Sequence, residues 1–128
     1  MRLLLDTCTF IWLTQEPARL SIEAARVLDD PANDLMLSYV SVWEIYSKAT
    51  AGKLRLPNAP RIWVEEQLSA RGLVELPIEL AALGRMSELP LHHRDPFDRL
   101  LVAQALVHRL TIVSPDPSLG PYGAKVLW

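Results

Sequence analysis

The chain has 128 residues, and its 50% hydrophobic and 22% charged residues are typical of a globular domain and exclude a disordered or collagen-like chain. Its net charge of -2 is unlike the strongly basic composition of proteins that wrap nucleic acid. No apolar run approaches about 18 residues, which excludes a membrane span, and the single cysteine without a secretory leader predicts a cytoplasmic location.

The helices and strands are predicted from the apolar patterns and from the residues that end them. The run Leu3-Leu4-Leu5 is typical of a buried strand that stops at Asp6. Pro31 and Gly52 each end a helical pattern, and Pro96 opens the longest one. In chain order we expect strand 2–6, helix 10–13, helix 21–30, strand 35–37, helix 38–51, helix 61–71, strand 73–76, helix 79–87, helix 97–109, strand 111–113 and an edge strand 125–128.

The alternation of short apolar strands with amphipathic helices predicts the fold class. Strand-helix-strand units with right-handed crossovers build a mostly parallel sheet that is covered by helices on both faces. No internal repeat, low-complexity tract or linker interrupts the sequence. We therefore expect an α/β fold in which residues 1–128 form one domain.

Acidic residues stand near the ends of the predicted strands, where ligands bind in open α/β sheets. Asp6 follows the first strand, and Glu44 lies two turns after the second. Asp95 and Asp98 open the helix before strand 111–113, and Asp116 follows that strand. Converging carboxylates repel one another unless a cation is bound, and oxygen ligands favour Mg²⁺ or Mn²⁺ over zinc. The pattern indicates a divalent metal site.

A structural explanation competes with the metal site. Ser41 and Glu44 have the spacing of a capping box, while Asp95 and Asp116 each precede a proline, as helix-capping residues do. Helices that follow strands begin near the strand ends, so capping would also explain why the acids cluster. The residues alone leave both interpretations open.

Four segments together resemble a known family. They are LLLDT at 3–7, SVWEI at 41–45, RDPFDRLLVAQA at 94–105 and the C-terminal residues 111–128. In this order they resemble a PIN-domain protein of the VapC toxin type, and the resemblance extends over essentially the whole chain. It implies a three-layer α/β/α domain, a Mg²⁺- or Mn²⁺-dependent endoribonuclease, a cognate antitoxin protein as partner, and a homodimer.

The resemblance also implies residue roles. The family's acids correspond to Asp6, Glu44, Asp98 and Asp116, and Asp95 belongs to the motif of this subgroup. The implied reaction is hydrolysis of an RNA phosphodiester bond by a metal-activated water, with Asp6 and Asp98 as direct ligands. Glu44 and Asp116 bind the metal directly or through water.

Other residues near the motifs have weaker assignments. Thr7 and Ser114 are candidates to orient the acids, while Arg99 either pairs with a neighbouring acid or holds a phosphate. His92 and His93 stand in a polar loop, where a solvated role is the common one. Many relatives carry His at or beside Cys8 and Thr in place of Ser114.

Two alternatives to the ribonuclease remain at this point. One is a non-catalytic PIN-like module that binds RNA or protein. The other is a phosphate-accepting receiver domain, which needs paired acids after the first strand and a late lysine, whereas here one acid follows that strand and Lys125 lies inside the last one. The amphipathic helices 21–30 and 61–71 are candidates to bind an antitoxin segment.

Overall fold

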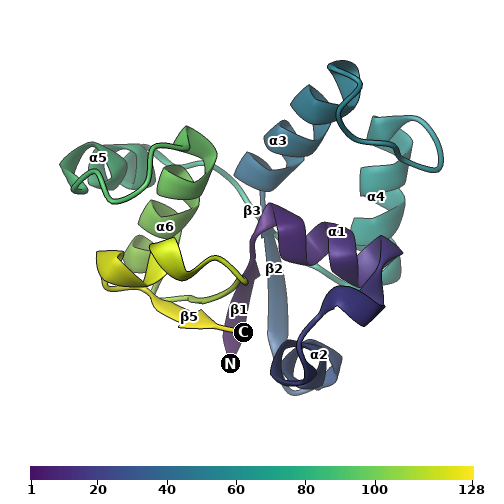
Figure 1. Ribbon diagram of the computed structural model, residues 1–128, viewed down its shortest axis with the longest axis horizontal. Coiled ribbons are helices and arrows are strands. Elements are labelled where there is room, and N and C mark those ends of the chain that lie inside the picture. Colours follow the sequence, from purple (N-terminus) through teal and green to yellow (C-terminus); the bar gives the residue numbers. More distant parts are fainter.

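The strands of the computed structural model, which describes residues 1–128, form one five-stranded sheet in the order β3-β2-β1-β4-β5 (Figure 1). Every pair of neighbouring strands is parallel, as predicted. The strands are β1 (Arg2–Leu5), β2 (Asp34–Ser38), β3 (Val74–Leu76), β4 (Thr111–Val113) and β5 (Lys125–Leu127). The α-helices are α1 (Thr7–Gln15), α2 (Ile22–Asp29), α3 (Tyr39–Thr50), α4 (Pro60–Ala70), α5 (Leu80–Glu88) and α6 (Pro96–His108), and the short 3₁₀ segments are η1 (Pro17–Arg19) and η2 (Pro117–Tyr122).

The order of the strands identifies one edge of the sheet as the place for a ligand. Leu5 at the end of β1 is in register with Leu37 of β2 and with Val113 of β4, so the carboxyl ends of these strands meet. The chain adds β2 and β3 on one side of β1 and then places β4 and β5 on the other side. In open α/β sheets, ligands bind where the strand order reverses in this way.

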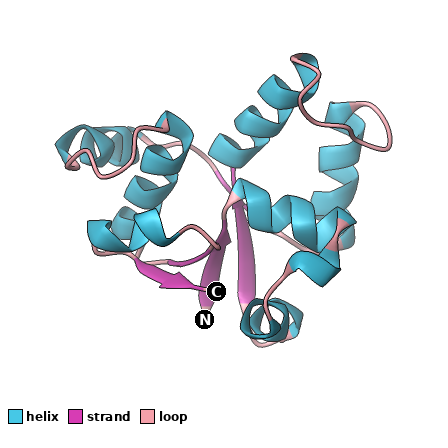
Figure 2. Ribbon diagram, viewed as in Figure 1, coloured by secondary structure: helices cyan, strands magenta, loops and turns pink.

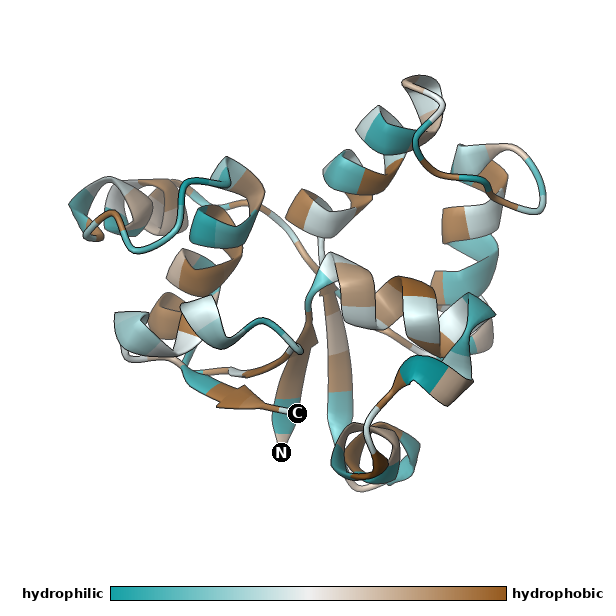
Figure 3. Ribbon diagram, in the orientation of Figure 1, coloured by the Kyte–Doolittle hydropathy of each residue, from teal (hydrophilic) through white to brown (hydrophobic).

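Apolar side chains of β1 point alternately to two hydrophobic clusters. Leu3 and Leu5 pack with Phe10 of α1 and Trp63 of α4, while Leu4 packs with Leu101 of α6 on the opposite face. Figure 2 shows α5 and α6 on one side of the strands and α1 to α4 on the other, and Figure 3 shows that β1 and β2 are mostly hydrophobic. The predicted three-layer α/β/α architecture is therefore confirmed.

A buried polar network fixes the start of α3. The hydroxyl of Ser38 accepts a hydrogen bond from the backbone N–H of Val40 (3.0 Å) and is bonded to the side-chain carbonyl of Gln104. The Gln104 amide in turn donates to the backbone carbonyl of Pro77 (3.0 Å). Since Ser38 is the last residue of β2, the network makes α3 begin directly at the strand end and places Glu44 near the edge where ligands bind.

Two of the local predictions are wrong. Helix α1 begins at Thr7 rather than at residue 10, because the Asp6 carboxylate caps it by accepting the Thr9 N–H (2.8 Å). The capping box predicted for Ser41 and Glu44 is not formed, because Ser38 caps α3 and the other two lie buried inside the helix. Helix α1 also ends two residues later than predicted, and the short segments η1 and η2 were not predicted. The boundaries of the other helices and strands agree with the sequence prediction to within one residue, and β5 is an edge strand as expected.

No helix of the chain is both long enough and apolar enough to cross a membrane.

Candidate active site

The five predicted acids line a single cavity of about 460 Å³. Asp6 comes from the end of β1 and Glu44 from α3, while Asp95 and Asp98 come from the start of α6 and Asp116 from the residue before η2. These positions surround the carboxyl ends of β1 and β4, where the strand order reverses. The structure thus brings together all the acids that the sequence predicted to converge.

Asp6 and Glu44 form the buried end of the cavity, with 5% and 6% of their surfaces exposed. Burial raises the pKa of the Asp6 carboxyl, and hydrogen bonds from Ser114 and Thr9 oppose that shift only in part. Glu44 forms an ion pair with the ammonium group of Lys48, one turn further along α3, at 2.5 Å. That hydrogen bond raises the pKa of Lys48.

Asp98 and Asp116 differ in their surroundings. Burial, followed by the charge of Asp95, raises the pKa of Asp98 to about 7. At Asp116, partial burial raises the pKa, but hydrogen bonds from Ser118 and His93 outweigh it and the net pKa lies below the usual range. The Oδ1 atom of Asp116 accepts both the N–H (2.9 Å) and the hydroxyl (2.7 Å) of Ser118, so its Oδ2 atom faces the other acids.

His93 joins this cluster, which the sequence did not predict. Its Nε2 atom lies 3.1 Å from Oδ2 of Asp98 and 3.2 Å from Oδ2 of Asp116. These three ligand-type atoms all lie within 4.8 Å of one another. The backbone N–H of His93 donates to the hydroxyl of Tyr122 (2.6 Å), which holds the loop over the acids. The position of His93 just before the Asp95-Pro96 helix start was the only signal in the sequence.

Thr7 and Ser114 lie where a supporting role was predicted. The Thr7 hydroxyl donates to the hydroxyl of Ser41 (3.0 Å), which ties α1 to α3 beside the buried acids. The Ser114 hydroxyl accepts the N–H of Asp116 (3.1 Å), and it lowers the pKa of Asp6 through a hydrogen bond. Both hydroxyls therefore connect segments that carry acids.

Arg99 does not form the predicted ion pair with a neighbouring acid. Its guanidinium group donates to backbone carbonyls of Met86 (3.2 Å), Leu89 (3.3 Å) and Pro90 (2.8 Å) at the end of α5. The carbonyls of Leu89 and Pro90 follow the last residue of α5, and that of Met86 also accepts the N–H of Leu89 (3.2 Å). Arg99 therefore holds the loop between α5 and α6.

Cys8 lies in the cavity wall but lacks the surroundings of a nucleophile. Burial, followed by the charge of Asp6, raises its pKa to about 11. A thiol with such a pKa carries almost no thiolate at neutral pH, and thiolate is the reactive form.

Capping explains only some of the acids. Asp6, Asp95 and Asp116 each accept a backbone N–H at the start of a helix, as the structural explanation predicted. Glu44 is inside α3, and Asp98 lies in the first turn of α6 after the cap. A carboxylate has two oxygens, so a capping acid still directs one oxygen elsewhere. Helix capping therefore does not account for the shared cavity.

The donor set fits a divalent cation. Carboxylate oxygens predominate in the cavity, and Lys48 and Lys53 are its only basic side chains. Burial and neighbouring carboxylates raise the pKa of Asp6 and of Asp98, which is the electrostatic cost that a bound cation would remove. Oxygen ligands are those that Mg²⁺ and Mn²⁺ prefer. Arranged around a scissile bond, such a site can activate water and stabilise charge on a phosphate.

Comparison with known families decides the classification. Residues 3–122 match the profile of the family described as PIN domain. This chain belongs to the PIN domain family. The matched segment contains all five acids and His93, so the family predicted from the four sequence segments is confirmed.

Individual PIN domain relatives extend this result. Ribonuclease VapC22 of Mycobacterium tuberculosis (strain ATCC 25618 / H37Rv) is 28% identical over 118 residues, which cover 91% of this chain and 88% of the relative. A crystal structure of VapBC2 from Rickettsia felis bound to a promoter DNA fragment aligns with a TM-score of 0.74 at 13% identity, covering 100% and 99% of the two chains. DNA-bound VapBC from Salmonella typhimurium aligns with a TM-score of 0.70 at 19% identity, covering 99% and 97%. At these identities, the two structures show a shared fold.

Proposed function

We propose that this PIN domain is a divalent-metal-dependent endoribonuclease of the VapC type, the toxin of a toxin–antitoxin pair. The observation that carries the proposal is the convergence of Asp6, Glu44, Asp98 and Asp116 on one cavity at the reversal of strand order. The identity to Ribonuclease VapC22 supports the ribonuclease assignment. We place the activity in the cytoplasm, where the free thiol of Cys8 stays reduced.

The four acids have different roles in binding the metal. Asp6 and Asp98 are the direct ligands, and Glu44 and Asp116 complete the site directly or through water. Asp98 has to lose its proton to serve as a ligand, so its raised pKa makes binding stronger as the pH rises toward about 7. When bound, Mg²⁺ or Mn²⁺ supplies a water of lowered pKa and positive charge for the phosphate. No side chain then needs to act as the general base.

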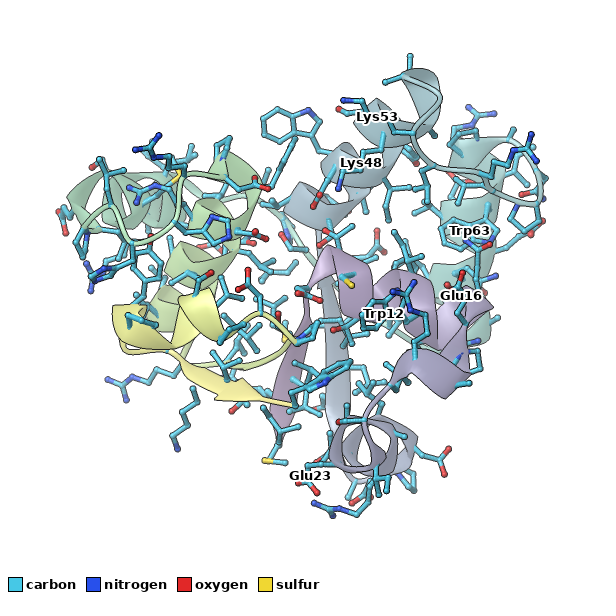
Figure 4. The ribbon with its side chains drawn as sticks, viewed as in Figure 1. Trp12, Glu16, Glu23, Lys48, Lys53 and Trp63 are labelled. Atoms are coloured by element: carbon cyan, nitrogen blue, oxygen red, sulfur yellow. The ribbon has the colours of Figure 1, made fainter.

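The rest of the cavity fits RNA. Its wall between α1 and α3 is formed by Trp12, Lys48 and Lys53, and Figure 4 shows these side chains on the same side of the molecule. Lysines bind the phosphate backbone of nucleic acids, whereas the Trp12 ring is already packed against the guanidinium group of Arg19, 4.2 Å from the ring centroid. Lys53 takes part in none of the ion pairs of the structure, so its charge is available for a phosphate.

RNA cleavage tests the proposal. Purified protein is incubated with a mixed pool of structured RNA in Mg²⁺, in Mn²⁺ and in EDTA. The Asp6→Asn variant removes one ligand, and Asp34→Asn is the matched control because Asp34 is exposed at the start of β2, outside the cavity. We expect cleavage only with metal, a loss of about 100-fold or more in Asp6→Asn, and no loss in the control. Protein that binds Mn²⁺ but cleaves nothing would instead be a non-catalytic binding module.

The antitoxin has a candidate surface on α1, η1 and α2. A groove of about 670 Å³ is lined by Leu13, Leu20 and Ile22, and Ile22 is 92% exposed. Such a groove suits the apolar face of a partner helix, and the VapBC relatives are described as toxin–antitoxin systems. We expect Ile22→Asp to lose binding of the antitoxin in a pull-down experiment while its RNA cleavage stays unchanged. Unchanged antitoxin binding in Ile22→Asp would place the antitoxin elsewhere.

A homodimer has a candidate surface on α3 and α5. The exposed side chains of Tyr39 and Trp43 lie on α3 and that of Leu83 lies on α5, and both helices pack against α6. Trp43 is 52% exposed although it packs on Phe97, with ring centroids 4.6 Å apart. We expect a dimer by light scattering and a monomer for Trp43→Glu. A monomeric unsubstituted protein would contradict this assignment.

A further inference from the structure

His93 lies between two of the proposed metal ligands, and its second ring nitrogen is also engaged. The Nδ1 atom accepts a hydrogen bond from the backbone N–H of Asp95 at 3.0 Å. The Nε2 atom faces Oδ2 of Asp98 and Oδ2 of Asp116 at nearly equal distances, 3.1 and 3.2 Å. The imidazole is 20% exposed and the hydroxyl of Tyr122 anchors its loop. The ring is therefore held in one orientation.

These contacts decide which nitrogen carries the proton. Because Nδ1 accepts an N–H, it has no hydrogen of its own, and the neutral ring carries its hydrogen on Nε2. His93 thus presents an N–H to the two carboxylates and not a lone pair. A histidine that ligates a metal has the opposite arrangement, with a free lone pair on one nitrogen and a donated N–H on the other.

If His93 bound the metal, it would lose the hydrogen bond from the Asp95 N–H that orients its ring. A metal on Nε2 would move the hydrogen to Nδ1, where it would point at the N–H of Asp95 across 3.0 Å. Two donors would then face each other at the cap of α6, where the Asp95 carboxylate already accepts the N–H of Phe97 (2.9 Å). The backbone at this cap is fixed by the helix and does not supply an acceptor in place of that N–H.

We propose that His93 is a positioning residue that holds Asp98 and Asp116 together as a pair of metal ligands without binding the metal itself. The inference rests on the proposed metal site and assigns a residue to it. Oδ1 of Asp116 is occupied by Ser118, so Oδ2 is the atom that His93 places. Ligand-type atoms of Asp98 and Asp116 lie within 4.8 Å of each other beside His93, so the two carboxylates lie close enough to hold one ion together.

Two variants separate positioning from ligation. His93→Gln keeps an N–H donor near the position of Nε2, and His93→Leu removes it. Mn²⁺ affinity is measured by titration of the free-ion electron paramagnetic resonance signal. We expect His93→Gln to stay within about threefold of the unsubstituted protein and His93→Leu to bind about 10–100-fold more weakly, the range for lost outer ligand contacts. The matched control is His92→Leu, whose exposed ring packs on Tyr122 outside the acid cluster and should leave affinity unchanged.

A spectroscopic measurement is independent of any variant. Electron spin echo modulation of bound Mn²⁺ detects a directly coordinated imidazole nitrogen, and we expect no such nitrogen in the unsubstituted protein. A coordinated nitrogen, equal losses in His93→Gln and His93→Leu, or full affinity in His93→Leu would each overturn the role of His93. If Asp6→Asn also leaves Mn²⁺ binding unchanged, or no Mn²⁺ binds at all, the metal site and the proposed function fail together.

Discussion

Asp98→Asn tests the electrostatics of the acid cluster, because it removes one negative charge and keeps the shape of the side chain. The pKa of Asp98 rises from its ordinary 3.8 to about 7 on folding, mainly through burial. An acid with a raised pKa destabilises the folded state as the pH increases from the unfolded value to the folded value. The penalty is absent below about pH 4 and complete above about pH 7. The substitution should therefore stabilise the metal-free protein at pH 8 and have little effect at pH 4.

The size of this effect follows from the shift. A change from 3.8 to about 7 corresponds to about 4 kcal/mol, which is an upper limit. The Asp98 side chain is 25% exposed and therefore partly screened, and its charge favours the first turn of α6 by about 0.3–1 kcal/mol. We expect a net gain of about 1–2 kcal/mol at pH 8, or a rise of several degrees in the thermal midpoint.

Thermal unfolding in EDTA at pH 5 and pH 8 measures the prediction. The gain of Asp98→Asn over the unsubstituted protein should be larger at pH 8, and the exposed Asp34→Asn should show no such difference. In Mn²⁺ at about 100 times its dissociation constant, the unsubstituted protein should gain about 2.7 kcal/mol that the variant lacks. A variant that is less stable at pH 8 in EDTA would refute the claim that the carboxylate is held at an electrostatic cost.

Two further predictions concern the scaffold. Phe10 is fully buried and its ring lies 5.6 Å from that of Trp63, so Phe10→Ala should lower the free energy of unfolding by about 3–5 kcal/mol in urea titration; a loss below about 1 kcal/mol would contradict the packing of α1 on the sheet. Ser38→Ala removes the cap of α3 and leaves the carbonyl of Gln104 without its donor, so it should cost about 1–3 kcal/mol. Ser38→Thr, which keeps the hydroxyl, is the matched control, and equal losses in both variants would argue against the hydrogen-bonded network.

Much of the fold could be predicted because local signals and the three-dimensional structure agree. The apolar run of β1 ends at an acid, Pro96 opens α6, and strands alternate with helices, so the parallel sheet follows from general rules. The start of α3 was predicted correctly to within one residue, but the capping box at Ser41 and Glu44 was wrong. Ser41 matched the capping spacing, but the chain turns into the helix directly at Ser38, where a buried amide from α6 stabilises the hydroxyl.

The candidate site was predictable only in part, because some of its contacts join segments that are distant in the sequence. The acids follow strand ends, and strand ends of a parallel sheet meet, so their convergence could be derived from the sequence. The role of His93 depends on a loop conformation that Tyr122 holds from 29 residues away, and no local pattern encodes that contact. The pairing of Arg99 with an acid was predicted wrongly because its partners are backbone carbonyls, which carry no signature in the sequence.

The central claim is that the acids of this PIN domain bind a divalent metal, and a crystal grown with Mn²⁺ tests it most directly. We expect an anomalous difference peak in the cavity within about 2.0–2.4 Å of carboxylate oxygens of Asp6 and Asp98, with His93 outside the coordination sphere. The peak should be absent from crystals of Asp6→Asn grown in the same way. A fully occupied Mn²⁺ elsewhere, or none in the cavity at saturating concentration, would contradict the account.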